Sequence, residues 1–387
     1  MAKKFVLEKA PFIRRVDNGK ITTNRIMTDV VIALIPIILF AWVKNGLLPF
    51  INNSANVSFF QMLYPLIFIL CGGLFSVVLE GLYFILFKYY FPNKYVENKK
   101  ICNLKTIIKD VRESYGVITG LILALILPMN TPFYVLLFGC FMGNIVFKML
   151  YGGFGHNIFN PALIAYAVIV VSFWGVIFAN NNTSGALDIV TGASPLINFK
   201  NADIISYNEI IAPYGDIWSF LFGFVPGAIG ETCSILIIFA FFYLLLRKAI
   251  SWIVPVFYVG TVFIISLIIM LINGYGMWYP LFHILSGGLL FGAVFMATEP
   301  VTTPRSPNGK AIYAIALGLF TLLFRLYGSL PGGVGTSMLF VGLFATLIDR
   351  VSAKLRMHRV NYRSVIGYTL IIVLFILISA YIIVKAV

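Results

Sequence analysis

Long apolar runs separated by short polar segments dominate the pattern of this sequence. A run of ~20 apolar residues can cross the hydrocarbon core of a bilayer as one helix. The pattern predicts eleven membrane-spanning helices, at residues 27–43, 60–87, 116–128, 132–150, 160–179, 231–246, 253–273, 280–297, 311–327, 334–349 and 365–384. The third and sixth of these runs are short for a full crossing, which favours broken or tilted helices there.

The positive charges are distributed very unevenly around these runs. If the N-terminus is cytoplasmic, 24 of the 28 Lys and Arg residues fall on the cytoplasmic side, against Lys44, Lys200, Arg325 and Lys385 on the other. This bias is the usual sign of membrane orientation, so we expect a multi-pass cell-membrane protein with residues 180–230 on the extracytoplasmic face. The basic residues lie beside apolar spans, where they meet membrane lipid, so the net charge of +14 does not indicate a nucleic-acid partner.

Composition and the order of the runs set the expected fold. Hydrophobic residues make up 60% of the chain and charged residues 11%, which excludes ordinary soluble domains. Five spans precede the longest polar segment and five follow it, and because five is odd, two similar halves would cross the membrane in opposite senses. We therefore predict an all-α polytopic membrane protein with about 10–11 transmembrane helices in two inverted five-helix repeats. The predicted parts are a cytoplasmic basic tail (1–26), a first membrane half (27–179), an extracytoplasmic loop (180–230), a second membrane half (231–350), and a basic loop with an additional C-terminal helix (351–387).

Two segments at the cytoplasmic ends of spans carry candidate chemistry. Residues 151–162 form a glycine-rich turn in which Asn160 suits the N-cap of the next helix and Pro161 its first turn. The turn is either a simple connection or a backbone nest that lets a planar or polar ligand approach closely. Residues 296–304 place hydroxyl groups and the carboxylate of Glu299 at the end of the eighth span, as a helix cap or as part of a site.

Few acidic residues lie in or near the apolar runs, where a charge is costly. Most of them are close to a span end, which favours solvation at the membrane interface, whereas Glu80 is the deepest and the best candidate for an internal polar site. The five are Asp29, Glu80, Glu231, Glu299 and Asp349. The four cysteines are far apart and form no CxxC pair, so no iron–sulfur or zinc ligand set is predicted.

The polar segment between the two halves contains the run Asp188-Ile189-Val190-Thr191-Gly192-Ala193-Ser194. A serine hydroxyl needs an activating base to act as a nucleophile, and no histidine lies near this run in sequence. The exposed hydroxyl is therefore better suited to accept a modification made by another enzyme.

Several of these motifs occur in one consistent order that resembles the NqrB/RnfD family of membrane subunits. That family belongs to the sodium-pumping NADH:quinone reductase and to Rnf-type ferredoxin:NAD oxidoreductases. The resemblance covers about residues 10–350. The motifs are Asn24-Arg25-Ile26-Met27 with Asp29, Ala33 to Pro36, Gly153 to Leu163, Asp188 to Leu196, Pro226 to Thr232, Phe295 to Pro304, Arg325 with Tyr327-Gly328, and Ile348-Asp349-Arg350.

The resemblance implies two flavin sites and no catalytic or metal-binding residue of the chain itself. A flavin transferase would esterify Ser194 with the phosphate of FMN, where most family members carry threonine. Asp188, Thr191, Gly192 and Ala193 would form the attachment motif. A non-covalent riboflavin is expected near Asn157, Asn160, Thr298 and Glu299. The fold would resemble the ten-span urea transporters, with the eleventh span as an addition.

The function implied by the resemblance is electron transfer through the membrane, coupled to translocation of Na⁺ or H⁺, as a subunit of an Rnf- or Nqr-type complex. Glu80 or Glu231 would be candidate coupling carboxylates. Two alternatives remain open. One is a flavin-bearing carrier of an extracellular electron-transfer chain that pumps no ion; the other is a solute channel of urea-transporter type without flavin, because one fold can host unrelated functions.

Overall fold

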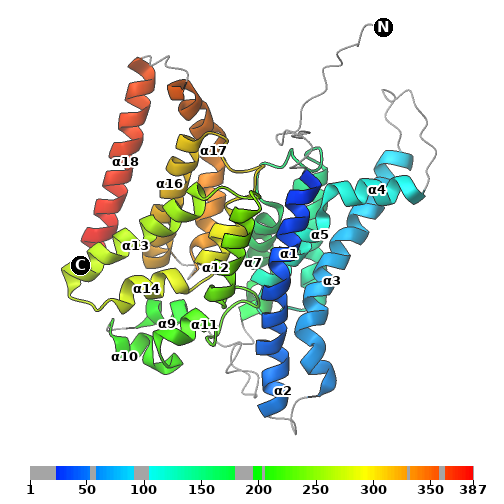
Figure 1. Ribbon diagram of the computed structural model, residues 1–387, viewed down its shortest axis with the longest axis horizontal. Coiled ribbons are helices and arrows are strands. Elements are labelled where there is room, and N and C mark those ends of the chain that lie inside the picture. The colour runs from blue at the N-terminus through cyan, green and yellow to red at the C-terminus, as the bar shows by residue number, and fades with distance from the viewer. Residues whose placement is uncertain are drawn as a thin grey trace.

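The computed structural model describes residues 23–52, 58–90, 104–178, 195–202, 205–328, 332–356 and 362–386, and within these ranges every regular element is a helix. Five helices are long and apolar enough to cross a membrane, and a sixth crossing is formed if one bent pair counts as a single span. The prediction of an all-α polytopic membrane protein is confirmed (Figure 1).

Each of the eleven predicted runs contains a helix close to the expected bounds. In the first half these are α1 (Thr23–Trp42), which continues through a π-helical turn (Val43–Leu47) into α2 (Leu48–Asn52), α3 (Phe59–Tyr83) with η2 (Phe84–Tyr90), α4 (Leu104–Ser114), α5 (Gly116–Ile126), α6 (Phe133–Cys140) with the π-helix η3 (Phe141–Met149), and α7 (Pro161–Phe178). In the second half they are α12 (Ser234–Leu246), α13 (Ile253–Asn273), α14 (Trp278–Leu285), α15 (Leu289–Phe291) with η6 (Gly292–Met296), α16 (Pro307–Tyr327) and α17 (Val334–Arg356).

In each half of the chain, an interruption formed by residues with positive φ separates two consecutive helices. In the first half Tyr115, in the left-handed conformation with φ 56°, separates the polar helix α4 from the apolar helix α5. In the second half the interruption lies in the eighth run instead of the sixth. There Gly287 and Gly288 have positive φ, and the helices on either side meet at a bend of 56°. Only glycine adopts this conformation without steric cost, which explains the break at that position.

Helices α3 and α5 pack closely because two glycines face each other. A Cβ atom added to Gly120 would overlap the carbonyl oxygen of Gly72, and one added to Gly72 would lie 2.6 Å from the carbonyl oxygen of Gly120. Between apolar helices in lipid, such small residues permit the backbone approach on which van der Waals packing depends.

In the segment between the two halves, the described residues form three short α-helices and one 3₁₀ helix (Ala212–Tyr214) at the end of the molecule where α2 lies. The α-helices are α9 (Pro195–Asn201), α10 (Tyr207–Ile210) and α11 (Ile217–Phe222). Figure 1 shows them at the opposite end from the start of α1. The backbone from Gly223 to Cys233 is irregular, as the Pro- and Gly-containing sequence there predicts.

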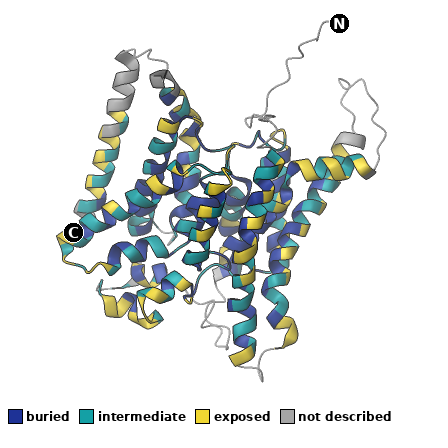
Figure 2. Cartoon of the chain, in the orientation of Figure 1, coloured by how far each residue is buried: buried dark blue, intermediate teal, exposed yellow. Residues whose placement is uncertain are grey.

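The additional C-terminal helix, α18 (Tyr362–Ala386), packs against α16, where the hydroxyl of Tyr327 donates to the carbonyl of Ile382 at 2.9 Å. Large apolar side chains such as Leu370 and Leu377 face outward along it, and the wider surface of the bundle carries many more (Figure 2). In a membrane protein this surface is the one in contact with lipid.

The structure corrects the interpretation of several charges. The charge pattern counts Lys44 and Arg325 on the extracytoplasmic side and Lys148 in a cytoplasmic loop, but all three are buried and bonded inside the helix bundle. Asp29, expected to be solvated at the interface, is also buried and pairs with Arg247 at 3.1 Å. Charge counting along a sequence cannot distinguish a loop lysine from one that points back into the bundle.

Replacing Gly120 by valine should destabilise the fold, because the branched side chain forces α3 and α5 apart. Overpacking of this kind costs about 1–3 kcal/mol. Thermal unfolding of the detergent-solubilised protein measures the loss. The matched control is Gly260→Val on α13, where an added Cβ meets nothing within 4 Å. Equal unfolding temperatures for the two variants would contradict the close approach of α3 and α5.

Candidate functional site

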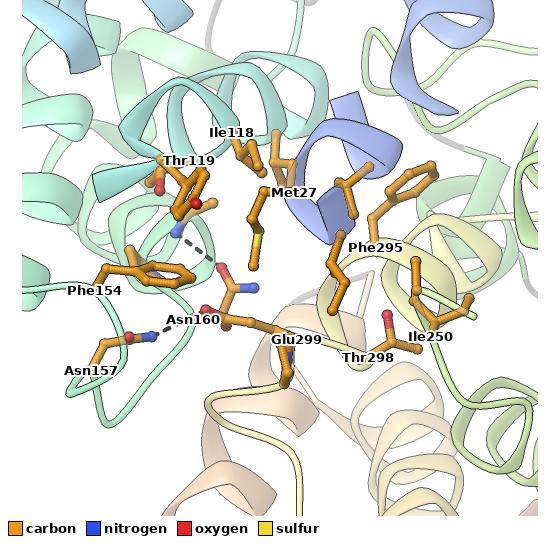
Figure 3. A pocket seen from close by; sticks show the side chains of 18 of the residues that line it. Met27, Ile118, Thr119, Phe154, Asn157, Asn160, Ile250, Phe295, Thr298 and Glu299 are labelled. Atoms are coloured by element: carbon orange, nitrogen blue, oxygen red, sulfur yellow. Dashed lines mark hydrogen bonds between the residues drawn. The ribbon is translucent and has the colours of Figure 1, made fainter. Parts of the chain in front are cut away.

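Two segments that are far apart in the sequence meet at the end of the molecule where α1 begins. The side-chain nitrogen of Asn157, in the loop before α7, donates to Glu299 Oε1 at 3.1 Å, across 142 residues of sequence. Asn160 and Thr298 line the same cavity as this pair (Figure 3). All four residues predicted for a riboflavin site are therefore brought together by the fold.

The loop from Tyr151 to Asn160 obtains its shape from its glycines and from the cap of α7. Gly152, Gly153 and Gly155 all have φ between 85° and 114°, a region that other residues rarely adopt. Asn160 Oδ1 accepts hydrogen bonds from the backbone N–H groups of Ala162 (3.0 Å) and Leu163 (3.2 Å). The N-cap role predicted for Asn160 is confirmed, and it orients the loop toward the cavity.

The loop after η6 is held by its own threonines. The hydroxyl of Thr303 donates to the carbonyls of Ala297 and Glu299, both at 2.7 Å, and closes the helix end. Thr302 donates to Glu299 Oε2 at 3.2 Å, so both carboxylate oxygens of Glu299 have partners. The predicted cap at this helix end is present, and it positions Glu299 as well.

The cavity between these loops, called here the first cavity, encloses empty space of about 730 Å³ including its mouth. Sites for small molecules and cofactors typically have mostly apolar walls with a few placed polar groups. The walls here follow that pattern. The apolar and aromatic lining includes Met27 and Val30 of α1, Tyr115, Ile118 and Ile122 at α5, Phe154, Ile250 and Phe295.

The charge in this cavity is set by two groups. The Glu299 carboxyl is withdrawn from bulk water at the cavity wall, and this burial raises the pKa of Glu299 to about 7. The hydrogen bonds from Asn157 and Thr302 favour the ionised form and reduce this rise. Lys148 from η3 also lines the cavity, and its positive charge opposes the same pKa rise. Sequence reasoning missed Lys148 as a site residue because it placed this side chain in a loop.

A second cavity lies beside the helix break at Gly287 and Gly288. It encloses about 1640 Å³ of empty space and has both apolar and polar walls. The carboxylate of Glu231 lies against Gly288, where an added Cβ would overlap it. Further lining residues include Tyr166, Trp174, Pro195, Pro226, Thr232, Ser286 and Thr336.

The predicted attachment motif, comprising Asp188, Thr191, Gly192, Ala193 and Ser194, lies outside the described residues. Its nearest described neighbour in the chain is Pro195, the first residue of α9. Because Pro195 lines the second cavity, the chain leaves the motif at the wall of that cavity.

The fold and the cavities define an all-α polytopic membrane protein with two cavities, each lined by apolar and polar side chains. Residues 6–358 match the NQR2, RnfD, RnfE family, and the chain belongs to that family, as the sequence motifs predicted. The match ends before α18 begins at Tyr362.

Three relatives illustrate the family, each of them the D component of an oxidoreductase complex. The component of the proton-translocating ferredoxin:NAD(+) oxidoreductase complex of Clostridium ljungdahlii is 32% identical over 355 residues, which cover 91% of this chain and 96% of the relative. The component of the Na(+)-translocating ferredoxin:NAD(+) oxidoreductase complex of Acetobacterium woodii is 34% identical over 248 residues, covering 63% and 73%. The component of the ion-translocating oxidoreductase complex of Alcanivorax borkumensis is 30% identical over 262 residues, covering 64% and 75%.

The raised pKa of Glu299 predicts a pH-dependent stability. In the unfolded chain this carboxyl ionises near pH 4.5, whereas in the folded protein it ionises near pH 7. Between these values the unfolded state loses the proton first, so folding stability falls as pH rises through this window. The variant Glu299→Gln cannot ionise at this position and lacks this loss of stability. The unfolding temperature of the variant minus that of the wild type should therefore increase from pH 5 to pH 8.

The exposed carboxylate of Glu209 in α10 provides the control. Glu209→Gln should follow the wild type across the same pH range in a thermal unfolding assay. A constant difference between Glu299→Gln and the wild type at every pH would contradict the assigned burial of Glu299.

Proposed function

We propose that this protein is the membrane subunit of an Rnf-type oxidoreductase complex, that it carries two flavins, and that it passes electrons between its two ends. The observation that carries this proposal is the meeting of Asn157, Asn160, Thr298 and Glu299 in one cavity, with Asn157 and Glu299 separated by 142 residues of sequence. The names of the relatives support the complex and its coupling to ion movement. Because those names include both H⁺ and Na⁺, the proposal leaves the ion open.

The first cavity suits riboflavin by the chemistry of its walls. An isoalloxazine ring is flat and largely apolar, with nitrogen and oxygen atoms along its edges. Asn157, Asn160 and Thr298 supply amide and hydroxyl groups for these edges, while Phe154 and Phe295 supply flat apolar surface. When bound, the flavin supplies the one-electron redox chemistry, whereas the chain binds and orients the ring and excludes water from it.

The second cavity suits the ring of an FMN attached to Ser194. Pro195 follows the acceptor directly and lines the cavity, so a flavin on Ser194 lies within reach of it. Trp174 and Tyr166 provide aromatic surface in its wall, and Thr232 provides a hydroxyl group. In this proposal Asp188, Thr191, Gly192 and Ala193 are the residues that a flavin transferase recognises.

The proposed orientation places the first cavity on the cytoplasmic side and the second on the extracytoplasmic side. Two features support it. The start of α1 and the helices α9–α11 lie at opposite ends of the molecule (Figure 1). The charge pattern of the sequence also places most basic residues on the same side of the membrane as the start of α1. Electrons from a partner subunit would then cross the cell membrane between the two flavins, and Glu80 and Glu231 are the proposed coupling carboxylates.

Replacing Ser194 by alanine should abolish covalent FMN, because the phosphoester has no acceptor oxygen. Ser194→Thr should retain it, since threonine offers the same hydroxyl. Mass spectrometry of the purified chain, expressed with a flavin transferase, detects the adduct on the peptide that contains residue 194. An FMN-sized adduct that persists in Ser194→Ala would move the attachment to another residue.

Removing the hydroxyl of Thr298 should weaken riboflavin binding about tenfold, the loss expected for one hydrogen bond worth ~1.4 kcal/mol. The flavin released by acid from purified Thr298→Val measures riboflavin per chain, while FMN on Ser194 stays bound to the protein. Thr261→Val is a matched control, because Thr298 and Thr261 both donate to the carbonyl four residues earlier, at 2.5 and 2.7 Å. Equal riboflavin loss in both variants would argue against the first cavity.

A further inference from the structure

A ladder of polar side chains runs between two otherwise apolar helices, α3 and the α6–η3 helix. Its three rungs recur every four residues on both helices, so they stack one turn above another. They are Cys140 Sγ to the carbonyl of Gly72 (3.5 Å), Asn144 Nδ2 to Ser76 Oγ (2.8 Å) and Lys148 Nζ to Glu80 Oε1 (2.7 Å). The two apolar runs carry this pattern in their sequences, but only their pairing in space makes it a ladder.

The last rung is an ion pair that is buried almost completely. The side chains of Lys148 and Glu80 are 2% and 0% exposed, and the ammonium also donates to the carbonyl of Ser114 at 2.6 Å. A charge in such a place is tolerated only when it is paired and hydrogen-bonded. Glu80 has no room to move away, because its carboxylate lies against Gly116, where an added Cβ would overlap it.

Lys148 faces the first cavity, and Glu80 does not. Lys148 is among the lining residues, and its Nζ lies 5.9 Å from the centre of the Phe154 ring, within range of a cation–π contact. Its bonds to Glu80 and Ser114 use two of the three N–H groups of the ammonium. The positive member of the pair therefore lies between the cavity and its counter-charge.

Charge at this position acts strongly on whatever occupies the cavity, because the site is enclosed and screened little by water. Lys148 already influences the ionisation of Glu299, on the other side of the cavity. A flavin bound there would supply one-electron chemistry, and electron uptake from a one-electron carrier of the complex would add negative charge beside Lys148. A nearby fixed cation stabilises that charge more than it stabilises the neutral ring.

We propose that Lys148 is a positioning residue of the first cavity that sets the reduction potential of the flavin there, and that Glu80 limits its effect by partial neutralisation. This inference rests on the proposed function, because it takes riboflavin as the occupant. It assigns a role to a residue that the sequence pattern placed in a loop, and it explains why an ion pair is kept in an apolar bundle where matched apolar side chains would serve packing equally well.

The test is a spectroelectrochemical titration of the non-covalent flavin in the purified full-length chain. Lys148→Met combined with Glu80→Gln removes both charges without leaving one unpaired. It should lower the equilibrium constant for one-electron reduction about tenfold, a shift of about 59 mV. Glu80→Gln alone keeps the cation and removes its counter-charge, so it should shift the constant in the opposite direction. Lys148→Arg should stay close to the wild type.

Lys44→Met is the matched control, since Lys44 is also buried but donates to the carbonyl of Val225 and lines neither cavity. If Lys148 served packing alone, the reduction potential of the flavin would not shift in the variants that retain it, or would shift with the same sign in all of them. Either result overturns the proposal. If the double variant does not accumulate, Glu80→Gln decides the question by the sign of its shift. If the purified wild-type chain contains no riboflavin, both the proposed occupant of the first cavity and the role of Lys148 are overturned. If riboflavin is bound but its potential is the same in all variants, only the role of Lys148 is overturned.

Discussion

The structure depends on one constraint, which is that backbone groups freed at a helix end inside a membrane bundle must find partners within the protein. Both halves meet it with a buried cation. Lys148 binds the carbonyl of Ser114 at the end of α4, and Arg325 binds the carbonyls of His283, Ser286 and Gly287 at the end of α14. Cations are also favoured at the C-terminal end of a helix by its dipole. The two side chains thus supply partners for backbone carbonyls that would otherwise be unpaired in an apolar bundle.

The interruptions in turn make the two cavities possible. Each cavity lies beside one break: Tyr115 and Lys148 line the first, and Gly287 and Gly288 line the second. A continuous helix would present only side chains at these positions, whereas a broken one also brings backbone groups and helix ends to the cavity wall. Broken helices that meet near the middle of the membrane are a recurrent means of building polar sites in inverted-repeat proteins.

Membership of the NQR2, RnfD, RnfE family and the geometry of the first cavity complement each other. The family match spans both halves of the chain, and the cavity is built from both halves, because α1 and the loop before α7 belong to the first and Glu299 to the second. A site formed between two halves is sensitive to small movements of one against the other.

The sequence by itself determined the helical architecture, because runs of apolar residues about 20 long have one stable solution in lipid. It also identified the family and the cap at Asn160, which depends on residues close to it in the chain. Only the tertiary structure decided that Lys148, Arg325 and Lys44 point into the bundle, that the second break falls at Gly287, and that Glu80 and Lys148 form an ion pair. These outcomes depend on which helix faces lie together, and neither periodicity nor charge counting along one chain contains that information.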